Sequence, residues 1–138
     1  MGHSQSKHSA HQPTSSYPPS RPYNSHADFT YTPLNHPRHF RILHLKRIVS
    51  QGSGDWKDTV LSGTLVETSL DDVPEYFALS YTWGDSTLCE HILIDGRVLK
   101  ITRSCAAALR RMLKGKLERV IWVDSICINQ ARMYIHDL

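Results

Sequence analysis

The sequence lacks long apolar runs, and no segment approaches the roughly 20 apolar residues that a membrane-spanning helix requires. Its first 30 residues also lack the short apolar stretch of a secretory signal, which argues against secretion. The three cysteines are an odd number without paired spacing, so we expect no disulfide framework. The formal net charge of +3 is too small to indicate a nucleic-acid partner. These absences predict a soluble, cytoplasmic protein and leave its function open.

Residues 1–38 lack isoleucine and valine altogether and contain one acidic residue, Asp28. The same segment holds six of the seven prolines and five of the nine histidines, together with many serines. Such a segment buries too little apolar surface to offset the conformational entropy of an ordered chain. We therefore predict that residues 1–38 form a disordered tail and that residues 39–138 form the folded part. The boundary is expected between His36 and Phe40.

The folded part contains several patterns that are typical of strands. Runs of β-forming apolar residues predict strands over residues 40–49, 59–68, 76–83 and 120–123, and a β-hairpin over residues 91–101. Within the hairpin, Asp95 and Gly96 provide the two positive φ angles that a type I′ turn requires. This turn places Leu93 opposite Val98. The 120–123 run is continuously apolar, which is typical of a strand that is buried on both faces.

Residues 102–114 are predicted to form a helix, because apolar residues recur along one stripe of it. Thr102 or Ser104 can cap its N-terminus, and Gly115 can end it. The helix connects the third predicted strand to the last one, and parallel pairing of those two strands would make a right-handed crossover. The expected fold class is therefore α/β, with a β-hairpin and a partly parallel sheet.

Two segments carry a more specific signal than the composition does. They read Phe77-Ala78-Leu79-Ser80-Tyr81-Thr82-Trp83-Gly84-Asp85 and Ile121-Trp122-Val123-Asp124-Ser125-Ile126-Cys127-Ile128-Asn129-Gln130. Both resemble the signature blocks of the heterokaryon incompatibility (HET) domain family of filamentous fungi, and the segment between them also fits that family. The resemblance covers residues 39–138. It implies a TIR-like α/β domain, preceded by the disordered tail.

The sequence departs from the family pattern after Gln130. Ala131 stands where the family usually has Asp, and residues 132–134 do not supply the Glu-Arg pair that follows in the family. The resemblance therefore implies a HET domain whose C-terminal part is missing. Such a domain would leave apolar surface uncovered, so we expect it to be less stable than a complete HET domain.

The family resemblance implies a signalling or interaction module in fungal non-self recognition and cell death. Its partners would be proteins, either further copies of this chain or other incompatibility proteins, and no cofactor, metal or nucleic acid is expected. One alternative, by analogy with TIR domains, is an enzyme that hydrolyses NAD. That reaction needs a carboxylate at the ribose bond, and the helix expected to supply it is missing here, which favours a non-enzymatic role. An inactive, truncated gene product is the other alternative.

Both blocks end where a predicted strand ends, which is where open α/β sheets bind ligands. Parallel pairing would bring together seven candidate pocket residues, namely Trp83, Gly84, Asp85, Asp124, Cys127, Asn129 and Gln130. A ring of a ligand could stack on the indole of Trp83, and the polar side chains could hydrogen-bond to the same ligand. A structural role competes with each of these: core packing for Trp83, a turn for Asp85, helix capping for Asp124, an inert buried thiol for Cys127, and support of loop backbone for Asn129 and Gln130.

The first six residues fit the acceptor pattern for N-myristoylation, with Gly2 as the modified residue. One myristoyl chain gives weak, reversible membrane association, and no cysteine near Gly2 offers a second acyl chain. The histidines of the tail have no zinc-like spacing, so they predict no metal site. The basic residues along the 102–114 helix predict a solvated face.

Overall fold

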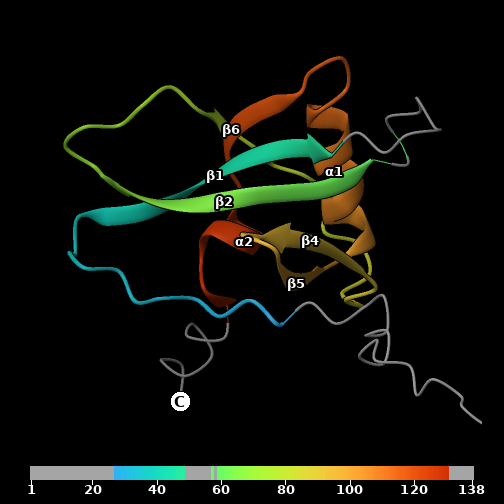
Figure 1. Cartoon of the computed structure of the whole chain (residues 1–138), viewed down its shortest axis with the longest axis horizontal. Helices are drawn as coiled ribbons and strands as arrows, with labels where there is room; N and C mark the ends of the chain where they lie inside the picture. Colours follow the sequence, from blue (N-terminus) through green and yellow to red (C-terminus); the bar gives the residue numbers. More distant parts are fainter. Residues whose placement is uncertain (1–26, 49–56, 58, 131–138) are drawn as a thin grey trace, which may run out of the picture.

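The computed structural model describes residues 27–48, 57 and 59–130 (Figure 1). In chain order, its elements are β1 (His39–Ile48), β2 (Val60–Ser69), β3 (Phe77–Ala78), β4 (Glu90–Ile94), β5 (Arg97–Ile101), α1 (Arg103–Met112), β6 (Glu118–Trp122) and α2 (Asp124–Cys127). The ends of β1, β2 and α1 lie close to those that the sequence predicts.

The strands form one mixed sheet in the order β3-β6-β1-β2-β4-β5. β3 pairs in parallel with β6, and β2 pairs in parallel with β4, whereas the other neighbours are antiparallel. The predicted parallel pairing of the two family-like blocks is confirmed, because Phe77 lies opposite Ile121. A mixed sheet with few helices also confirms the α/β class.

The predicted hairpin and helix are both present. In the hairpin formed by β4 and β5, Leu93 lies opposite Val98, and Asp95 and Gly96 have φ angles of 51° and 78°. The hydroxyl of Thr102 accepts a hydrogen bond from the backbone N–H of Cys105 at 3.1 Å, which caps α1. These local features follow the turn and capping chemistry of the sequence.

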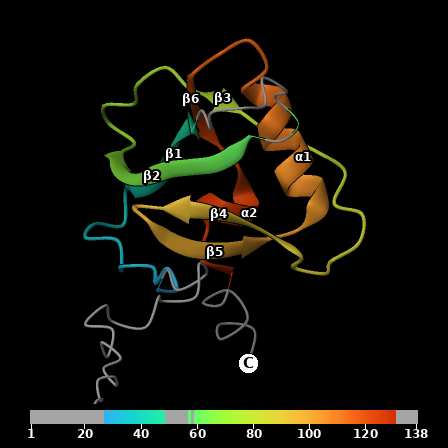
Figure 2. The ribbon, with the colours of Figure 1, turned by 45° about the vertical axis from the view of Figure 1, so that its right-hand side comes forward.

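The core lies between α1 and one face of the sheet, where α1 packs against β2 and β4 (Figure 2). Its fully buried side chains include Leu43, Leu45, Leu61, Ile92, Ile94, Leu109, Leu113 and Ile121. Gly63 of β2 is tightly packed at the centre of the sheet, since a Cβ atom there would lie 2.6 Å from the carbonyl oxygen of His44. α2 packs against β1.

The predicted strand over residues 76–83 is wrong in length. β3 contains two residues, and the chain then leaves the edge of the sheet. Trp83 is 46% exposed, so it does not pack in the core. The physical reason is that β3 is an edge strand with one neighbour, so the alternating pattern beyond Ala78 is not held by a second ladder of hydrogen bonds.

The last strand also differs from its prediction. Ile121 and Val123 are fully buried, whereas Val120 and Trp122 are only half-buried. β6 therefore packs fully on one face, and the continuous apolar run does not mark burial on both faces. A continuous apolar run shows that a strand could be buried on both faces. Whether both faces are buried depends on which of them the other elements of the fold cover.

Residues 27–38, here named the N-terminal strap, depart from the composition-based expectation. The strap runs along the sheet (Figure 1) and bridges to β5: the N–H of Phe29 donates to the carbonyl of Val98 at 2.8 Å, and the N–H of Val98 donates to the carbonyl of Ala27 at 2.9 Å. The structure thus places ordered contacts on the N-terminal side of the predicted boundary at residues 36–40. Residues 1–26, including Gly2, lie outside the described residues.

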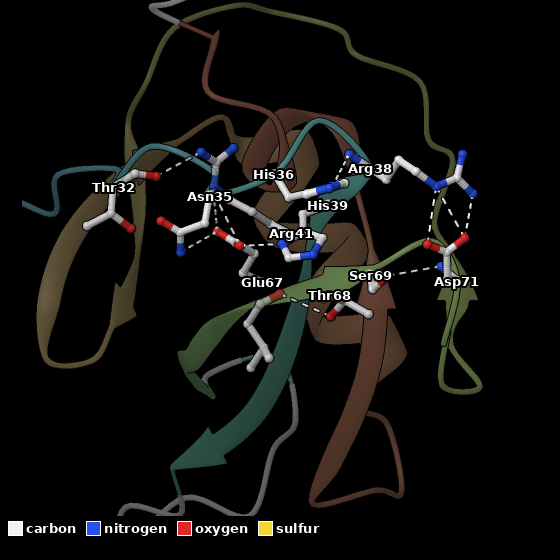
Figure 3. Close-up of polar contacts among 11 residues, drawn as sticks. Thr32, Asn35, His36, Arg38, His39, Arg41, Glu67, Thr68, Ser69 and Asp71 are labelled. Carbon is white, nitrogen blue, oxygen red and sulfur yellow. Dashed lines mark hydrogen bonds and ion pairs between the residues drawn. The ribbon is translucent and has the colours of Figure 1, made fainter.

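Polar contacts fasten the second half of the strap to β1, β2 and the loop that follows (Figure 3). Nη2 of Arg41 donates to the carbonyl of Thr32 at 3.0 Å, and the N–H of Asn35 donates to Oε1 of Glu67 at 3.1 Å. Glu67 also lies 2.5 Å from Nδ1 of His39, and this hydrogen bond lowers the pKa of the Glu67 carboxyl. The strap is therefore held by backbone and side-chain contacts at several places.

In the described part of the chain, neither helix has the length and apolar character needed to cross a membrane.

Candidate functional site

The two family-like blocks are joined by hydrogen bonds as well as by strand pairing. The N–H of Leu79 donates to the carbonyl of Trp122 at 2.8 Å. The hydroxyl of Tyr81 donates to Oγ of Ser125 at 3.0 Å, and Oγ of Ser125 lies 3.4 Å from Sγ of Cys105. Ser125 is thereby fixed at the start of α2, next to the first turn of α1.

A cavity of about 600 Å³ lies between these blocks, β5 and the strap. Its apolar lining consists of Phe29, Tyr31, Trp83, Leu88, Leu99 and Ile101. Its polar lining consists of Thr30, Ser86, Lys100, Thr102, Ser125, Asn129 and Gln130. The volume falls within the range of about 300–1,000 Å³ that is typical of small-molecule sites, and the mixture of apolar walls with a few polar groups is typical as well.

Three of the seven predicted site residues line this cavity: Trp83, Asn129 and Gln130. Gly84, Asp85, Asp124 and Cys127 are not among its lining residues. Gly84 has a φ angle of 61°, and a Cβ atom there would lie 2.9 Å from Oγ of Ser104 in α1. Its backbone therefore approaches the first turn of the helix closely, in place of the ligand that the sequence suggested.

The two aspartates have structural contacts. Oδ1 of Asp85 accepts hydrogen bonds from the N–H and the hydroxyl of Thr87 at 2.9 and 2.8 Å. The hydrogen bond from the N–H is the main reason that the pKa of the Asp85 carboxyl is lowered. This is the turn role weighed for Asp85. The capping role predicted for Asp124 is wrong, because Val123 is the N-cap of α2 and the cap has no side-chain hydrogen bond. Nε2 of Gln130 donates to the carbonyl of Asp124 at 2.9 Å, which confirms the loop-support role of Gln130.

Cys127 is a buried thiol, as the inert alternative requires. Its side chain is 3% exposed, and burial raises the pKa of the thiol to about 11. The N–H of Val123 donates to its Sγ at 3.5 Å. Because a thiol attacks as the thiolate, Cys127 has almost no reactive form at neutral pH.

Several residues that build the cavity were not predicted from the sequence, and Tyr31 is the most constrained of them. Its hydroxyl donates to the carbonyl of Ile126 at 2.6 Å, and burial raises the pKa of Tyr31 to about 12. The guanidinium of Arg41 lies 5.1 Å from the centre of the Tyr31 ring. Phe29 and Tyr31 are two positions apart, which is the spacing of residues on one face of an extended segment. The surrounding prolines and polar residues, which are typical of disorder, obscured this signal.

The described residues contain no group of three histidine, cysteine or acidic side chains arranged to hold a metal ion.

Comparison with known families identifies the two blocks. Residues 76–135 match the model of the family described as Heterokaryon incompatibility protein (HET). These residues make up less than half of the chain, and the match shows that this segment is similar to the HET family. The HET match begins at the residue before β3, so β1 and β2 lie outside the matched range although they share its sheet.

A curated relative shows the same similarity. In an alignment of 70 residues that covers 41% of this chain, the sequence is 41% identical to "Heterokaryon incompatibility protein 6, OR allele" of Neurospora crassa. The match covers 10% of the length of that relative, so this chain corresponds to a small part of it. No solved structure matched the chain.

Proposed function

We propose that this chain is a signalling and interaction module of fungal heterokaryon incompatibility, and that it acts in non-self recognition and cell death. The observation that carries the proposal is the match of residues 76–135 to the HET family, together with the relative named for heterokaryon incompatibility. Its partners are then proteins, either further copies of the chain or other incompatibility proteins. It works in the cytoplasm, with weak and reversible membrane association if Gly2 is myristoylated.

The chemistry of the cavity supports binding over catalysis. Its polar lining is made of hydroxyls, amides and the amine of Lys100, which recognise ligands through hydrogen bonds. Hydrolysis of NAD, the alternative taken from TIR domains, would need a carboxylate at the ribose bond. The two carboxylates among the predicted site residues are those of Asp85 and Asp124. Neither residue lines the cavity, and the Asp85 carboxylate accepts a hydrogen bond from Thr87.

Trp83 offers the sharpest test of this site, because Tyr76 is a matched control in the same part of the chain. Both are aromatic and similarly exposed, at 46% and 41%, but only Trp83 lines the cavity. The full chain, Trp83→Ala and Tyr76→Ala would be expressed from an inducible promoter in a filamentous fungus. Colony growth and uptake of a viability dye would be measured at equal protein levels.

The expected result is growth arrest and dye uptake with the unchanged chain and with Tyr76→Ala, and normal growth with Trp83→Ala. Normal growth with all three proteins at verified expression would contradict the signalling role. Equal toxicity of Trp83→Ala and Tyr76→Ala would contradict the assignment of the site. Loss of cellular NAD that precedes the growth arrest would instead favour the hydrolysing alternative.

A further inference from the structure

We propose that the cavity between the family-like blocks, β5 and the strap binds a flat aromatic molecule with one negative charge, and that such a ligand holds the strap to the sheet. This ligand class rests on the proposed function, since the cavity is taken there as a binding site. Three properties of the cavity point to it: the aromatic walls, the charge of the lining, and the segments that form the lining.

The first aromatic wall is Trp83, whose indole is held in place by the second block. The Trp83 ring stacks on that of Tyr81, with 6.1 Å between their centres and 14° between their planes. The hydroxyl of Tyr81 in turn donates to Oγ of Ser125 at 3.0 Å. Trp83 lines the cavity and remains 46% exposed, so the protein positions an aromatic surface there without burying it in the core.

The second aromatic wall comes from the strap. The rings of Phe29 and Tyr31 meet edge-on, with 5.0 Å between their centres. The Tyr31 hydroxyl donates to the carbonyl of Ile126 at 2.6 Å, which fixes the pair. Three of the six apolar lining residues are therefore aromatic, and each is held by other contacts of the protein. Because aromatic rings gain more from contact with each other than the buried area alone provides, these walls favour an aromatic ligand over an aliphatic one.

The lining of the cavity is positively charged. Among the described residues, Lys100 is the one charged side chain that lines it, and no aspartate or glutamate does. The residue opposite Lys100 on β4 is His91, and the adjacent Glu90 lies 3.6 Å from the guanidinium of Arg110. Within the described part of the chain, the Lys100 amine forms no hydrogen bond or ion pair. A ligand with one negative group supplies the partner that this cation lacks.

An amide of the lining is also available to the ligand. Asn129 lines the cavity, and its side chain forms no hydrogen bond with another described residue. It can donate to a carboxylate or sulfonate oxygen. Gln130 differs, because its Nε2 already donates to the carbonyl of Asp124 at 2.9 Å. The lining thus offers one cation and one amide donor to a negative group.

The strap forms part of the cavity, so ligand binding and strap docking are linked. Phe29, Thr30 and Tyr31 line the cavity while the strap lies against the sheet, where the N–H of Phe29 donates to the carbonyl of Val98 at 2.8 Å. A ligand that contacts these residues binds the docked form more tightly than an undocked one. It therefore shifts the chain towards the docked form.

Isothermal titration calorimetry on the full chain tests the ligand class with three probes of similar size. 2-Naphthoate has both required features, 2-naphthamide lacks the charge, and decahydro-2-naphthoate lacks the aromatic rings. We expect 2-naphthoate to bind with a Kd of about 1 mM or lower, and about threefold more tightly than either of the other probes. Raising the ionic strength should weaken the binding of 2-naphthoate and leave that of 2-naphthamide unchanged.

Matched variants assign the probe to this cavity, once circular dichroism has verified that each is folded. Lys100→Gln should weaken 2-naphthoate about threefold and leave 2-naphthamide unchanged. Lys46→Gln, which removes an exposed lysine of β1 outside the lining, should change neither. Trp83→Ala should weaken 2-naphthoate about tenfold, whereas Tyr76→Ala should not weaken it.

Hydrogen exchange measures the link to the strap. At a 2-naphthoate concentration of about ten times its Kd, exchange at the amides of Phe29 and Val98 should slow about tenfold, because undocking then requires release of the ligand. The amide of Lys116 is the control, since it donates to the carbonyl of Leu113 at 3.0 Å and neither residue lines the cavity. Its exchange rate should not change.

Every outcome decides a part of the proposal. Absence of 2-naphthoate binding at millimolar concentration overturns it, as does binding of either other probe that is equally tight or tighter. Equal effects of Lys100→Gln and Lys46→Gln also overturn it, and unchanged exchange at Phe29 overturns the link to the strap. None of these measurements uses cell growth. Absence of binding beside a growth arrest that depends on Trp83 would refute this ligand class alone, whereas binding without growth arrest would refute the proposed function alone.

Discussion

Replacing Gly63 by alanine tests the packing at the centre of the sheet. Gly63 of β2 lies opposite Leu45 of β1 and Ile94 of β4. The added Cβ would lie 2.6 Å from the carbonyl oxygen of His44 and 2.9 Å from Cδ1 of Leu43. Rotation of the leucine relieves the second contact, but the first is with backbone, so β1 and β2 must move apart.

Two effects of opposite sign decide the magnitude. Alanine in a strand is favoured over glycine by about 0.5–1 kcal/mol, because the alanine chain loses less conformational entropy on folding. Overpacking a tight site costs about 1–3 kcal/mol, and the upper end applies where backbone has to shift. The expected net loss in the free energy of unfolding is about 2 kcal/mol. For a folded part of this size, it corresponds to a melting temperature lower by about 8–16 °C.

Thermal unfolding followed by circular dichroism measures this loss. Gly115→Ala is the matched control, because Gly115 has a φ angle of 73° and a Cβ there meets no heavy atom within 4 Å. Its cost is that of the left-handed backbone alone, about 1–2 kcal/mol. A Gly63→Ala protein as stable as the unchanged chain would refute the reasoning, since the entropy gain would then have outweighed the collision with the carbonyl.

Three other properties can be checked directly. In the folded protein iodoacetamide should alkylate the exposed Cys89 and reach the buried Cys105 and Cys127 only after unfolding, and peptide mapping that finds equal modification of all three would contradict their burial. Because the pKa of Tyr31 rises from 10.0 to about 12 on folding, its contribution to stability is complete below about pH 10 and declines as the pH rises towards 12. Tyr31→Phe should lose about 1 kcal/mol at neutral pH and flatten that alkaline decline in a series of thermal melts, whereas an unchanged decline would assign it to other groups. Intact-mass analysis of protein from a fungal host should show a myristoyl adduct on Gly2, and an unmodified or acetylated Gly2 would remove the membrane hypothesis.

The sequence predicted the parts of the fold that local chemistry determines. The turn at Asp95 and Gly96 has the backbone angles that its residues favour, and the Thr102 cap sets the start of α1. The parallel pairing of β3 with β6 was also predictable, because a helix connects two strand patterns. For the turn and the cap, a few adjacent residues carry the preference, so no knowledge of distant contacts was needed.

The features that the sequence missed depend on contacts between distant segments. Composition assigned the strap to a disordered tail, yet Tyr31 and Ile126 are 95 positions apart and their hydrogen bond exists only in the folded protein. The exposure of Trp83 likewise depends on β3 lying at the edge of the sheet. For the site, the sequence predicted Trp83, Asn129 and Gln130 as lining residues, but the wall formed by the strap was not predictable from composition.

The bridge between the strap and β5 has a mechanical consequence. Within the described part of the chain, a load that arrives from the N-terminal side of Ala27 meets the two hydrogen bonds of Val98 first. They lie at one end of the attachment and bear the load before the Tyr31 contact does, so the strap peels from β5 residue by residue. Because Phe29 and Tyr31 are wall residues of the cavity, tension on the N-terminus would open the cavity while the sheet behind it stays intact.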